Sequence, residues 1–400
     1  MSMRSIPLTA DIIRGASEIE HADGRVRLHR LPTWVRHQFP GPQLLAMEAQ
    51  PAGIRLTFRT CATEIELVIH SRWTNYVGLS RPRGTVDVLI DGELAARNTL
   101  TGGDVVEFNM LTGAVERRSG EHCTTHVTGL PSAEKTIEMW LPHNESMDLV
   151  SLHADAPVSP VTDNAQHRWT HYGSSISQGS NAAAPSETWT SIASRRLGLD
   201  LENLGFGGSA VLDPFMARVI RDSPAEVISI KIGINIANTD SMRLRSFVPA
   251  VHGFLDTIRD GHPETPLLVM SPLYCGLQET TPGPLAMDPE ALAAGTTGFL
   301  ATGDEKETSQ GRLTLEVIRD ALDGVFSTRS TSDPHLHYLD GIRLFGAADA
   351  DRYPLADGLH PDAPAHHLIG ERFVEYAHSD SSAFSHLAEA QKLRESTAHA

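Results

Sequence analysis

Cysteine and long hydrophobic runs are both scarce in this sequence of 400 residues. The 3 cysteines are odd in number and widely spaced, which argues against a disulfide framework or a zinc cluster, so we expect buried thiols. No segment approaches the roughly 18 apolar residues that a membrane helix needs. The N-terminal segment also lacks the apolar stretch of a signal peptide, so we expect a cytoplasmic protein with no membrane partner.

Positively charged residues are also few in this sequence. The sequence has 33 Lys and Arg residues against 50 Asp and Glu residues, a formal net charge of −17 at pH 7. Nucleic-acid affinity comes mostly from cationic side chains that displace counterions from phosphates. The composition therefore predicts no nucleic-acid partner, and the same argument disfavours an anionic membrane surface. The length of the chain fits two domains.

Residues 1–160 show the alternation that is typical of β-strands. Apolar and polar residues alternate at 54–58, 65–69, 86–90 and 137–141. A period of two indicates strands with one buried and one solvated face. Because turn residues separate these strands and no helical stripe interrupts them, we predict an all-β sandwich, jelly-roll-like, over residues 1–160.

The pattern changes after the proline-containing stretch 156–160. Residues 161–380 alternate strand-like runs with helical stripes, which predicts a parallel sheet with helices on both faces and a site at the carboxyl ends of its strands. Asp213 is expected to be an N-cap, followed by Pro214 at the first helical position. The helical stripes cover 189–197, 213–220, 247–258, 313–322 and 368–376, and the strand-like runs cover 227–230, 266–270 and 335–339.

Two segments have no clear periodicity. Residues 276–306 are rich in Gly, Pro, Thr and Ala. A loop of this length in a compact domain is usually functional or disordered, and this one is a candidate cover that excludes water from a site. Residues 381–400 form a C-terminal tail, with one weak amphipathic segment through Phe384 and Leu387.

Four short segments at predicted strand ends carry side chains suited to acyl transfer. A Ser-rich turn after a strand places a hydroxyl at the sheet edge, where backbone amides can point at a bound oxygen. Glycines let backbone amides approach a ligand closely. Taken singly, each segment has a structural alternative: a Ser/Gly loop, a buried and satisfied Asn amide, or a surface turn capped by Asp. The segments are Gly173-Ser174-Ser175, Asn203 to Gly208, Gly233-Ile234-Asn235 and Asp357 to His360.

In this order the four segments resemble the signature of the GDSL, or SGNH, serine hydrolase family, over roughly residues 165–378. The resemblance implies a flavodoxin-like α/β domain and an enzyme, a serine esterase or O-acyltransferase. Two positions depart from the family pattern: Ser174 replaces the usual Asp, and Ile236 replaces an acid that often follows the Asn. Neither is a proton-transfer or oxyanion position in the family. Ser174 leaves open which serine attacks, although the flanking residues favour Ser175.

Carried over to this sequence, the resemblance implies a catalytic triad of Ser175, His360 and Asp357. Ser175 is then the nucleophile and His360 the base, while Asp357 orients the imidazole and stabilises the imidazolium. The implied oxyanion hole combines the backbone amides of Ser175 and Gly208 with the side-chain amide of Asn235. Preorganised donors of this kind are needed where negative charge develops.

A metal site is the competing interpretation of the histidines. His335 and His337 lie on one face of a predicted strand. His360, His366 and His367 lie close together in the sequence. No Glu-x-x-His pattern or Cys pair accompanies them, and 20 histidines in 400 residues produce such neighbours by chance. We therefore expect no metal and no cofactor.

The predicted reaction is acyl transfer through a covalent acyl-enzyme on a small-molecule ester or thioester. The acceptor is water, as in an esterase, or a hydroxyl of a natural product. A sandwich ahead of the hydrolase domain is similar to the arrangement in natural-product acyltransferases, including a salicylyl transferase, and in some carbohydrate esterases. Two alternatives stay open: a carbohydrate O-deacetylase, and a carbohydrate-binding module fused to an inactive hydrolase domain. The N-terminal domain would bind carbohydrate, shape the substrate or serve only the fold.

Overall fold

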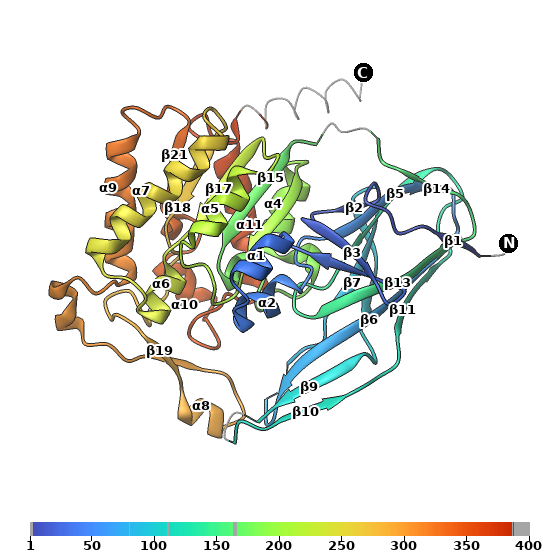
Figure 1. Ribbon diagram of the computed structural model, residues 1–400, viewed down its shortest axis with the longest axis horizontal. Coiled ribbons are helices and arrows are strands. Elements are labelled where there is room, and N and C mark those ends of the chain that lie inside the picture. The colour runs from blue at the N-terminus through green and yellow to red at the C-terminus, as the bar shows by residue number, and fades with distance from the viewer. Residues whose placement is uncertain (1–2, 80, 110–111, 163–165, 386, 388–400) are drawn as a thin grey trace. The chain divides into compact units, whose positions relative to one another are not determined.

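The computed structural model describes residues 3–79, 81–109, 112–162, 166–385 and 387 (Figure 1). These residues belong to two compact units. The first covers residues 1–165 together with Ala184–Ser186, and the second covers Gln166–Ala183 and the chain from Glu187 onwards. The return of Ala184–Ser186 to the first unit has no counterpart in the sequence pattern.

The first unit contains two sheets built mainly from antiparallel strands. The larger sheet has the order β10 (Val115–Arg118), β9 (Asp104–Phe108), β6 (Glu64–Tyr76), β13 (Ser146–Ala154), β4 (Arg25–His29), β3 (Glu18–Ala22), with β1 (Arg4–Ile6) on β13 and β11 (Cys123–Thr128) on β6. The smaller sheet has the order β14 (Val158–Pro160), β5 (Arg55–Thr60), β12 (Lys135–Trp140), β7 (Thr85–Ile90), β8 (Glu93–Thr99), with β2 (Ile13–Arg14) on β5. Strand β9 pairs with β6 in parallel.

Alternating apolar residues of the two sheets fill one core. Ile137 and Met139 of β12 and Ile65 and Leu67 of β6 belong to the same cluster, and each has an exposed fraction of 0%. The polar residues between them are less buried, as a pleated strand with one inner face requires. The predicted sheet-rich N-terminal domain is therefore confirmed.

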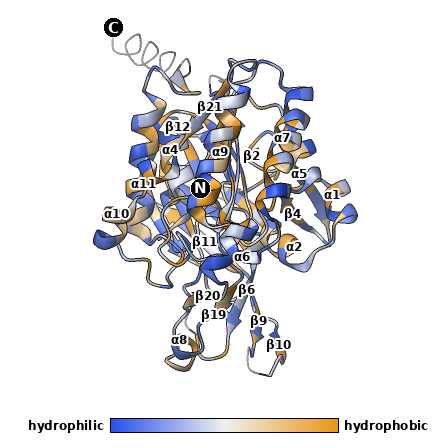
Figure 2. Ribbon diagram, turned by 90° about the vertical axis from the view of Figure 1, so that its left-hand side faces the viewer, coloured by the Kyte–Doolittle hydropathy of each residue, from blue (hydrophilic) through white to orange (hydrophobic). Residues whose placement is uncertain are grey.

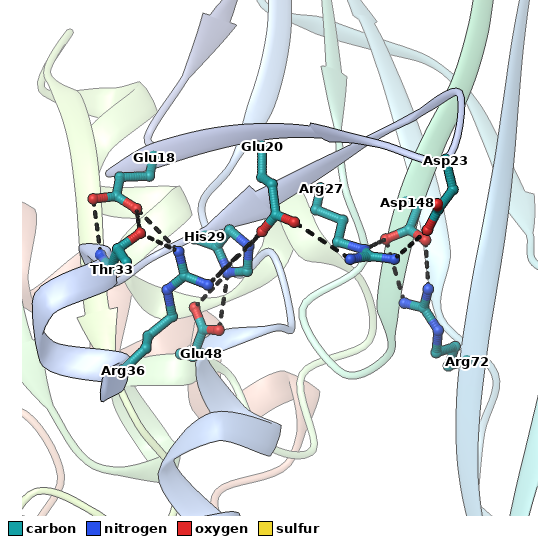
Figure 3. A network of polar contacts seen from close by, with 10 residues as sticks. All are labelled: Glu18, Glu20, Asp23, Arg27, His29, Thr33, Arg36, Glu48, Arg72 and Asp148. Carbon is teal, nitrogen blue, oxygen red and sulfur yellow. Dashed lines mark hydrogen bonds and ion pairs between the residues drawn. The ribbon is translucent and has the colours of Figure 1, made fainter. Parts of the chain in front are cut away.

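Two short helices, α1 (Thr33–Gln38) and α2 (Pro42–Glu48), also belong to this unit, and the all-β prediction did not include them. Helices this short show no helical period in a sequence. Charged side chains connect them to the sheet (Figure 3): His29 of β4 lies 3.0 Å from Glu48 of α2 and 3.2 Å from Glu20 of β3. Arg36 of α1 donates to Glu18 of β3 at 3.0 Å. His29 and Glu48 are buried and contact one another, as polar groups removed from water require.

The second unit is built on a five-stranded parallel sheet. Its order is β16 (Asp200–Gly205), β15 (Arg168–Gly173), β17 (Val227–Lys231), β18 (Leu267–Met270), β21 (Leu336–Leu339). Numbered along the chain, this is the 2-1-3-4-5 order of flavodoxin-like folds, in which ligands bind at the carboxyl ends of the strands. The predicted α/β fold is confirmed.

Helices cover both faces of this sheet (Figure 1). On one face, α4 and α11 pack together, and Trp169 of β15 stacks on Phe373 of α11 with ring centroids 5.3 Å apart. On the other face, Tyr172 of β15 stacks on Phe254 of α7 at 5.6 Å. The helices are α3 (Ser175–Gln178), α4 (Trp189–Arg196), α5 (Pro214–Arg221), α6 (Ile234–Thr239), α7 (Leu244–Gly261), α9 (Leu315–Arg329), α10 (Ala347–Arg352) and α11 (Ala363–Ala377), with short 3₁₀ helices at Glu305–Gln310 and Gly341–Arg343. A third 3₁₀ helix, Pro185–Glu187, begins in the segment Ala184–Ser186 of the first unit.

The segments without clear periodicity have defined structure where they are described. Residues 276–306 contain a hairpin of β19 (Leu285–Met287) and β20 (Phe299–Ala301), with α8 (Pro289–Ala293) between the strands. In the C-terminal segment, Phe384 is 1% exposed and packs edge-on against Trp169, with ring centroids 5.6 Å apart. Residues 388–400 lie outside the described residues.

Helix α5 begins at Pro214 as predicted, but Asp213 does not cap it with its side chain. Burial raises the pKa of the Asp213 carboxyl to about 6. Hydrophilic and hydrophobic residues alternate along long helices such as α7 and α11 (Figure 2). Within the described residues, no helix combines the length and the apolar character needed to cross a bilayer.

Candidate active site

The serine, histidine and aspartate of the predicted triad lie in hydrogen-bond contact. The Ser175 hydroxyl is 2.9 Å from Nε2 of His360, and Nδ1 of His360 is 2.7 Å from Oδ2 of Asp357. An ionised carboxylate only accepts hydrogen bonds, so Asp357 places the imidazole proton on Nδ1. Nε2 is then an acceptor for the Ser175 hydroxyl, which is the tautomer needed to remove a proton from serine.

The turn before α11 keeps Asp357 ionised. Its Oδ1 accepts the backbone N–H groups of Leu359 at 2.9 Å and His360 at 2.7 Å. Burial by itself raises the pKa of Asp357, but the hydrogen bonds and the charge of His360 outweigh it and hold the pKa below its usual value. The carboxylate is therefore available to orient His360 over the whole neutral range.

Ser175 is the first residue of α3, and the extended Ser174 joins this helix to β15. Within residues 171–179, Ser175 alone is not buried. Ser174 is 0% exposed, and its hydroxyl has no hydrogen-bond partner among the described residues. A Cβ on Gly173 would lie 2.2 Å from the Ser177 hydroxyl oxygen, so this close turn requires glycine. Of the two candidate serines, the geometry favours Ser175.

Three N–H donors at neighbouring strand ends have no hydrogen-bond partner within the described chain. They are the backbone amides of Ser175 and Gly208 and the Nδ2 group of Asn235. The Asn235 side chain is 2% exposed, and its Oδ1 accepts the Ala210 amide at 3.1 Å. That bond fixes which atom of the carboxamide is oxygen and leaves Nδ2 as a donor. Asn235 and the loop that carries Gly208 are therefore in direct contact, as the expected oxyanion hole requires.

Gly233 sets the start of α6, the helix that carries Asn235. It adopts a φ of 124°, and a Cβ there would lie 2.6 Å from the Ile318 side chain and 2.8 Å from that of Pro272. Both the backbone conformation and the lack of space therefore call for glycine. The Gly-x-Asn spacing thus has a local structural reason.

A buried polar network beneath α3 was missed by the sequence reasoning. Trp169 donates through Nε1 to the Ser229 hydroxyl at 2.8 Å, and His171 lies 2.7 Å from Ser229 and 2.8 Å from the Ser177 hydroxyl. Burial, together with the charge of Lys231, holds the pKa of His171 well below its usual value, so the ring is neutral. In the sequence, only His171 within the strand Arg168–Gly173 marks this network.

The hairpin of residues 276–306 reaches His360. The rings of Phe299 on β20 and His360 meet edge to face, with centroids 6.1 Å apart. The base of the loop is held by Arg319 of α9, which pairs with Glu279 at 2.7 Å. Glu279 also accepts the backbone N–H of Cys275 at 2.8 Å. This segment therefore contributes directly to the surroundings of the candidate active site.

Two of the other histidines that were considered for a metal site, His366 and His337, have separate partners. His366 is buried, accepts the Trp189 amide at Nδ1 at 3.2 Å and donates from Nε2 to the Ser180 carbonyl at 2.9 Å. His337 donates to the Ser381 carbonyl at 3.1 Å. In the part of the chain that the structure describes, no group of three or more His, Cys, Asp or Glu side chains is arranged to hold a metal ion.

Models of two protein families match this chain, one in each unit. Residues 166–275 match the model of the GDSL-like lipase/acylhydrolase family. These residues, nearly all in the second unit, are therefore similar to that family. Residues 12–150 match the model of the SsfX3 N-terminal domain. The family predicted from the four motifs is therefore confirmed, as is the enzyme class, an esterase or acyltransferase.

Several similar solved structures match nearly the whole length of this chain. The salicylyl-acyltransferase SsfX3 from a tetracycline biosynthetic pathway is 27% identical, with a TM-score of 0.73 over 93% of this chain and 95% of its own. A GDSL-like lipase from Bacteroides ovatus (19% identity, TM-score 0.65, 93% and 96%) and a family two carbohydrate esterase from Cellvibrio japonicus (11%, 0.55, 98% and 99%) share the fold. No curated protein matches the sequence.

Proposed function

We propose that this chain is a serine-dependent acyl-transfer enzyme, in which Ser175 forms a covalent acyl-enzyme with a small-molecule ester or thioester. The observation that carries the proposal is the continuous line of contacts from the Ser175 hydroxyl through His360 to Asp357, at 2.9 Å and 2.7 Å. A serine hydroxyl is a poor nucleophile unless a neighbouring base removes its proton. His360 in its Nδ1-protonated form is that base.

In the first half of the reaction, Oγ of Ser175 attacks the acyl carbon while His360 takes the hydroxyl proton. The carbonyl π electrons move onto oxygen, and the backbone amides of Ser175 and Gly208 and the Nδ2 group of Asn235 donate to this oxyanion. The tetrahedral intermediate collapses when the bond to the leaving oxygen or sulfur breaks. His360 returns the proton to that leaving group, and Asp357 stabilises the imidazolium throughout.

In the second half, an acceptor resolves the acyl-enzyme. His360 removes a proton from water or from an alcohol, whose oxygen attacks the acyl carbon. The Ser175–acyl bond then breaks, and His360 returns the proton to the Ser175 oxygen, which restores the free serine. The 27% identity to a salicylyl-acyltransferase over nearly the whole chain supports transfer to a hydroxyl of a natural product. The Phe299 ring beside His360 supports it too, because an apolar cover limits the access of water. Hydrolysis by the same machinery is the esterase form of the proposal.

The decisive experiment detects the acyl-enzyme itself. The full chain is incubated with a panel of acyl esters and thioesters, and the adduct on Ser175 is located by intact mass and peptide mapping. It is then chased with water alone or with candidate alcohols. Ester formed only when an alcohol is present supports the transferase, and rapid release of free acid without one supports the esterase.

Fluorophosphonate labelling separates the enzyme from the non-enzymatic alternative. The proposal requires labelling of the wild type that disappears in Ser175→Ala. A wild type that is not labelled and forms no adduct would instead favour a binding module fused to an inactive hydrolase domain. Release of acetate from acetylated sugars, but from no other ester, would favour the carbohydrate O-deacetylase.

A further inference from the structure

Three side-chain carboxamides hold the loop that carries Gly208. The loop covers residues 205–210, from the last residue of β16 onwards, and each carboxamide oxygen accepts one of its backbone N–H groups. Two of the three belong to segments that the family motifs already single out, whereas Gln178 has no part in the proposed mechanism. The contacts are Gly205 N to Asn203 Oδ1 (2.7 Å), Gly207 N to Gln178 Oε1 (2.9 Å) and Ala210 N to Asn235 Oδ1 (3.1 Å).

Gly208 directly follows the residue that Gln178 holds. Its own N–H has no partner in the described parts of the chain, and the residue is exposed, with a φ of 69°. On its other side, the Ser209 amide donates to the Phe206 carbonyl at 3.1 Å. The N–H groups before and after Gly208 are therefore engaged, and their bonds set the direction in which the Gly208 N–H points.

Gln178 also ties this loop to the helix of the proposed nucleophile. It is the last residue of α3, in which Ser175 is the first, and it is 3% exposed. Asn203 adds a second tie, because its Nδ2 donates to the Ser177 carbonyl at 2.9 Å. A Cβ on Gly205 would lie 2.4 Å from the Gln178 backbone nitrogen, so the loop packs directly on α3.

We propose that Gln178 is a positioning residue of the oxyanion hole, which sets the Gly208 N–H relative to the Ser175 N–H through its bond to Gly207. The inference rests on the proposed function. Hydrogen bonds weaken steeply as their angle departs from linear, so both donors must point at the same oxygen. The loss of the tie therefore acts mainly on the transition state, where that oxygen carries charge, and little on substrate binding.

The variant Gln178→Met removes the acceptor and keeps the length of the side chain. With hydrolysis of p-nitrophenyl acetate by the full chain as the probe reaction, we expect kcat to fall about 10- to 100-fold, less than the about 10²–10³-fold for removal of a hole donor. KM should stay within about twofold, because ground-state contacts are unchanged. Ser194→Ala is the control: it removes a buried hydrogen bond of α4 to the Ser191 carbonyl without touching the loop, and kcat should be unchanged.

A transition-state analogue separates positioning from a general structural role. Ser175 adds to the carbonyl carbon of 1,1,1-trifluorodecan-2-one, His360 takes the hydroxyl proton, and the carbonyl π electrons become a hemiketal oxyanion in the hole. Decan-2-one carries the same chain but forms no such adduct to a comparable extent. In Gln178→Met, inhibition by the trifluoro ketone should weaken by the factor lost in kcat/KM, and inhibition by decan-2-one should change by less than about twofold.

Equal kcat and equal trifluoro ketone inhibition in wild type and Gln178→Met would overturn the role of Gln178. If that variant does not fold, Gln178→Asn keeps a buried carboxamide that is one methylene too short, and the same selective loss is expected. An unchanged ratio of trifluoro ketone to decan-2-one inhibition there would overturn the role as well. The proposed function fails differently: Ser175→Ala would then retain the wild-type rate, whatever Gln178 does.

Discussion

The rings of Phe299 and His360 meet edge to face, with centroids 6.1 Å apart and ring planes inclined by 70°. Phe299 pairs with Met287 across the hairpin, and both are half-buried. Leu300, on the opposite face of the strand, is 43% exposed. The hairpin thus turns an apolar face towards the proposed catalytic base and its other face towards solvent.

We expect Phe299→Ala to shift the acyl-enzyme from alcohol towards water. Removing the ring opens the surroundings of His360 to solvent, and water then competes better with an alcohol acceptor. The measurement is the ratio of free acid to ester formed from p-nitrophenyl butyrate in the presence of 2-phenylethanol. We expect this ratio to rise severalfold. A fluorophosphonate should still label Ser175 in the variant, because the nucleophile itself is unchanged.

The hairpin supplies its own control for this prediction. Leu300→Ala removes an apolar side chain of similar size from the solvent-facing side of the same strand, and the product ratio should match the wild type. If both variants raise the ratio equally, the effect belongs to the hairpin as a whole. Phe299 would then have no specific role beside His360.

Asn235→Ala tests the oxyanion hole directly. The change removes the Nδ2 donor and the acceptor of the Ala210 amide together, and we expect kcat to fall about 10²–10³-fold. The matched control is Asn238→Ala on the same helix, since Oδ1 of Asn238 has no hydrogen-bond partner in the described chain. Steady-state kinetics compare kcat in the two variants, and thermal unfolding checks that both are folded. A wild-type kcat in Asn235→Ala would remove this residue from the site.

Local sequence signals located the parts of the site that lie within single turns. The Gly-Ser-Ser turn, the Gly-x-Asn segment and the Asp-x-x-His segment each combine a special backbone geometry with a functional side chain. Gly173 and Gly233 lack room for a Cβ, and Asp357 binds the backbone of its own turn. Such constraints act between neighbours in the chain, and for that reason they are readable in the sequence. The parallel sheet with helices on both faces follows from the alternating pattern in the same way.

Contacts between distant segments were beyond the sequence. The bond from Gly207 to Gln178 depends on how β16 lies beside α3, and no local pattern distinguishes this glutamine from a solvent-facing one. The strands β19 and β20 are too short to display a period, so Phe299 gave no sign that it meets His360. Ser186 donates to the buried Asp87 of β7 at 2.5 Å, which ties Ala184–Ser186 to the first unit. Tertiary packing alone decides such contacts.

Asp357→Asn tests the orientation of the imidazole. An asparagine can donate from Nδ2 towards Nδ1 of His360, which favours the tautomer with the proton on Nε2 and removes the base from Ser175. In a serine protease triad this change lowers kcat about 10⁴-fold, and we expect a loss of that order here. The kcat of the variant is compared with that of Asp362→Asn, which changes the carboxylate that caps α11 and does not touch His360. A modest loss in Asp357→Asn, equal to that in Asp362→Asn, would contradict the triad.

The pH dependence of stability provides a test centred on His366. Burial lowers the pKa of this fully buried histidine to about 4. An unfolded histidine has a pKa of about 6.5, so between these values the unfolded chain binds a proton that the folded chain does not. Stability therefore falls as the pH falls from about 6.5 towards 4, by about 3 kcal/mol at most for this one group.

His366→Gln should flatten this dependence, because glutamine can accept the Trp189 amide and donate to the Ser180 carbonyl without titrating. The melting temperature of the full chain, followed by calorimetry from about pH 7 to about pH 5, should decrease less in the variant than in the wild type. The neighbouring His367 has a half-exposed side chain, so His367→Gln should follow the wild-type curve. Parallel curves for His366→Gln and the wild type would show that His366 is not held neutral by the fold. The acid sensitivity would then come from other groups, among them the buried His171.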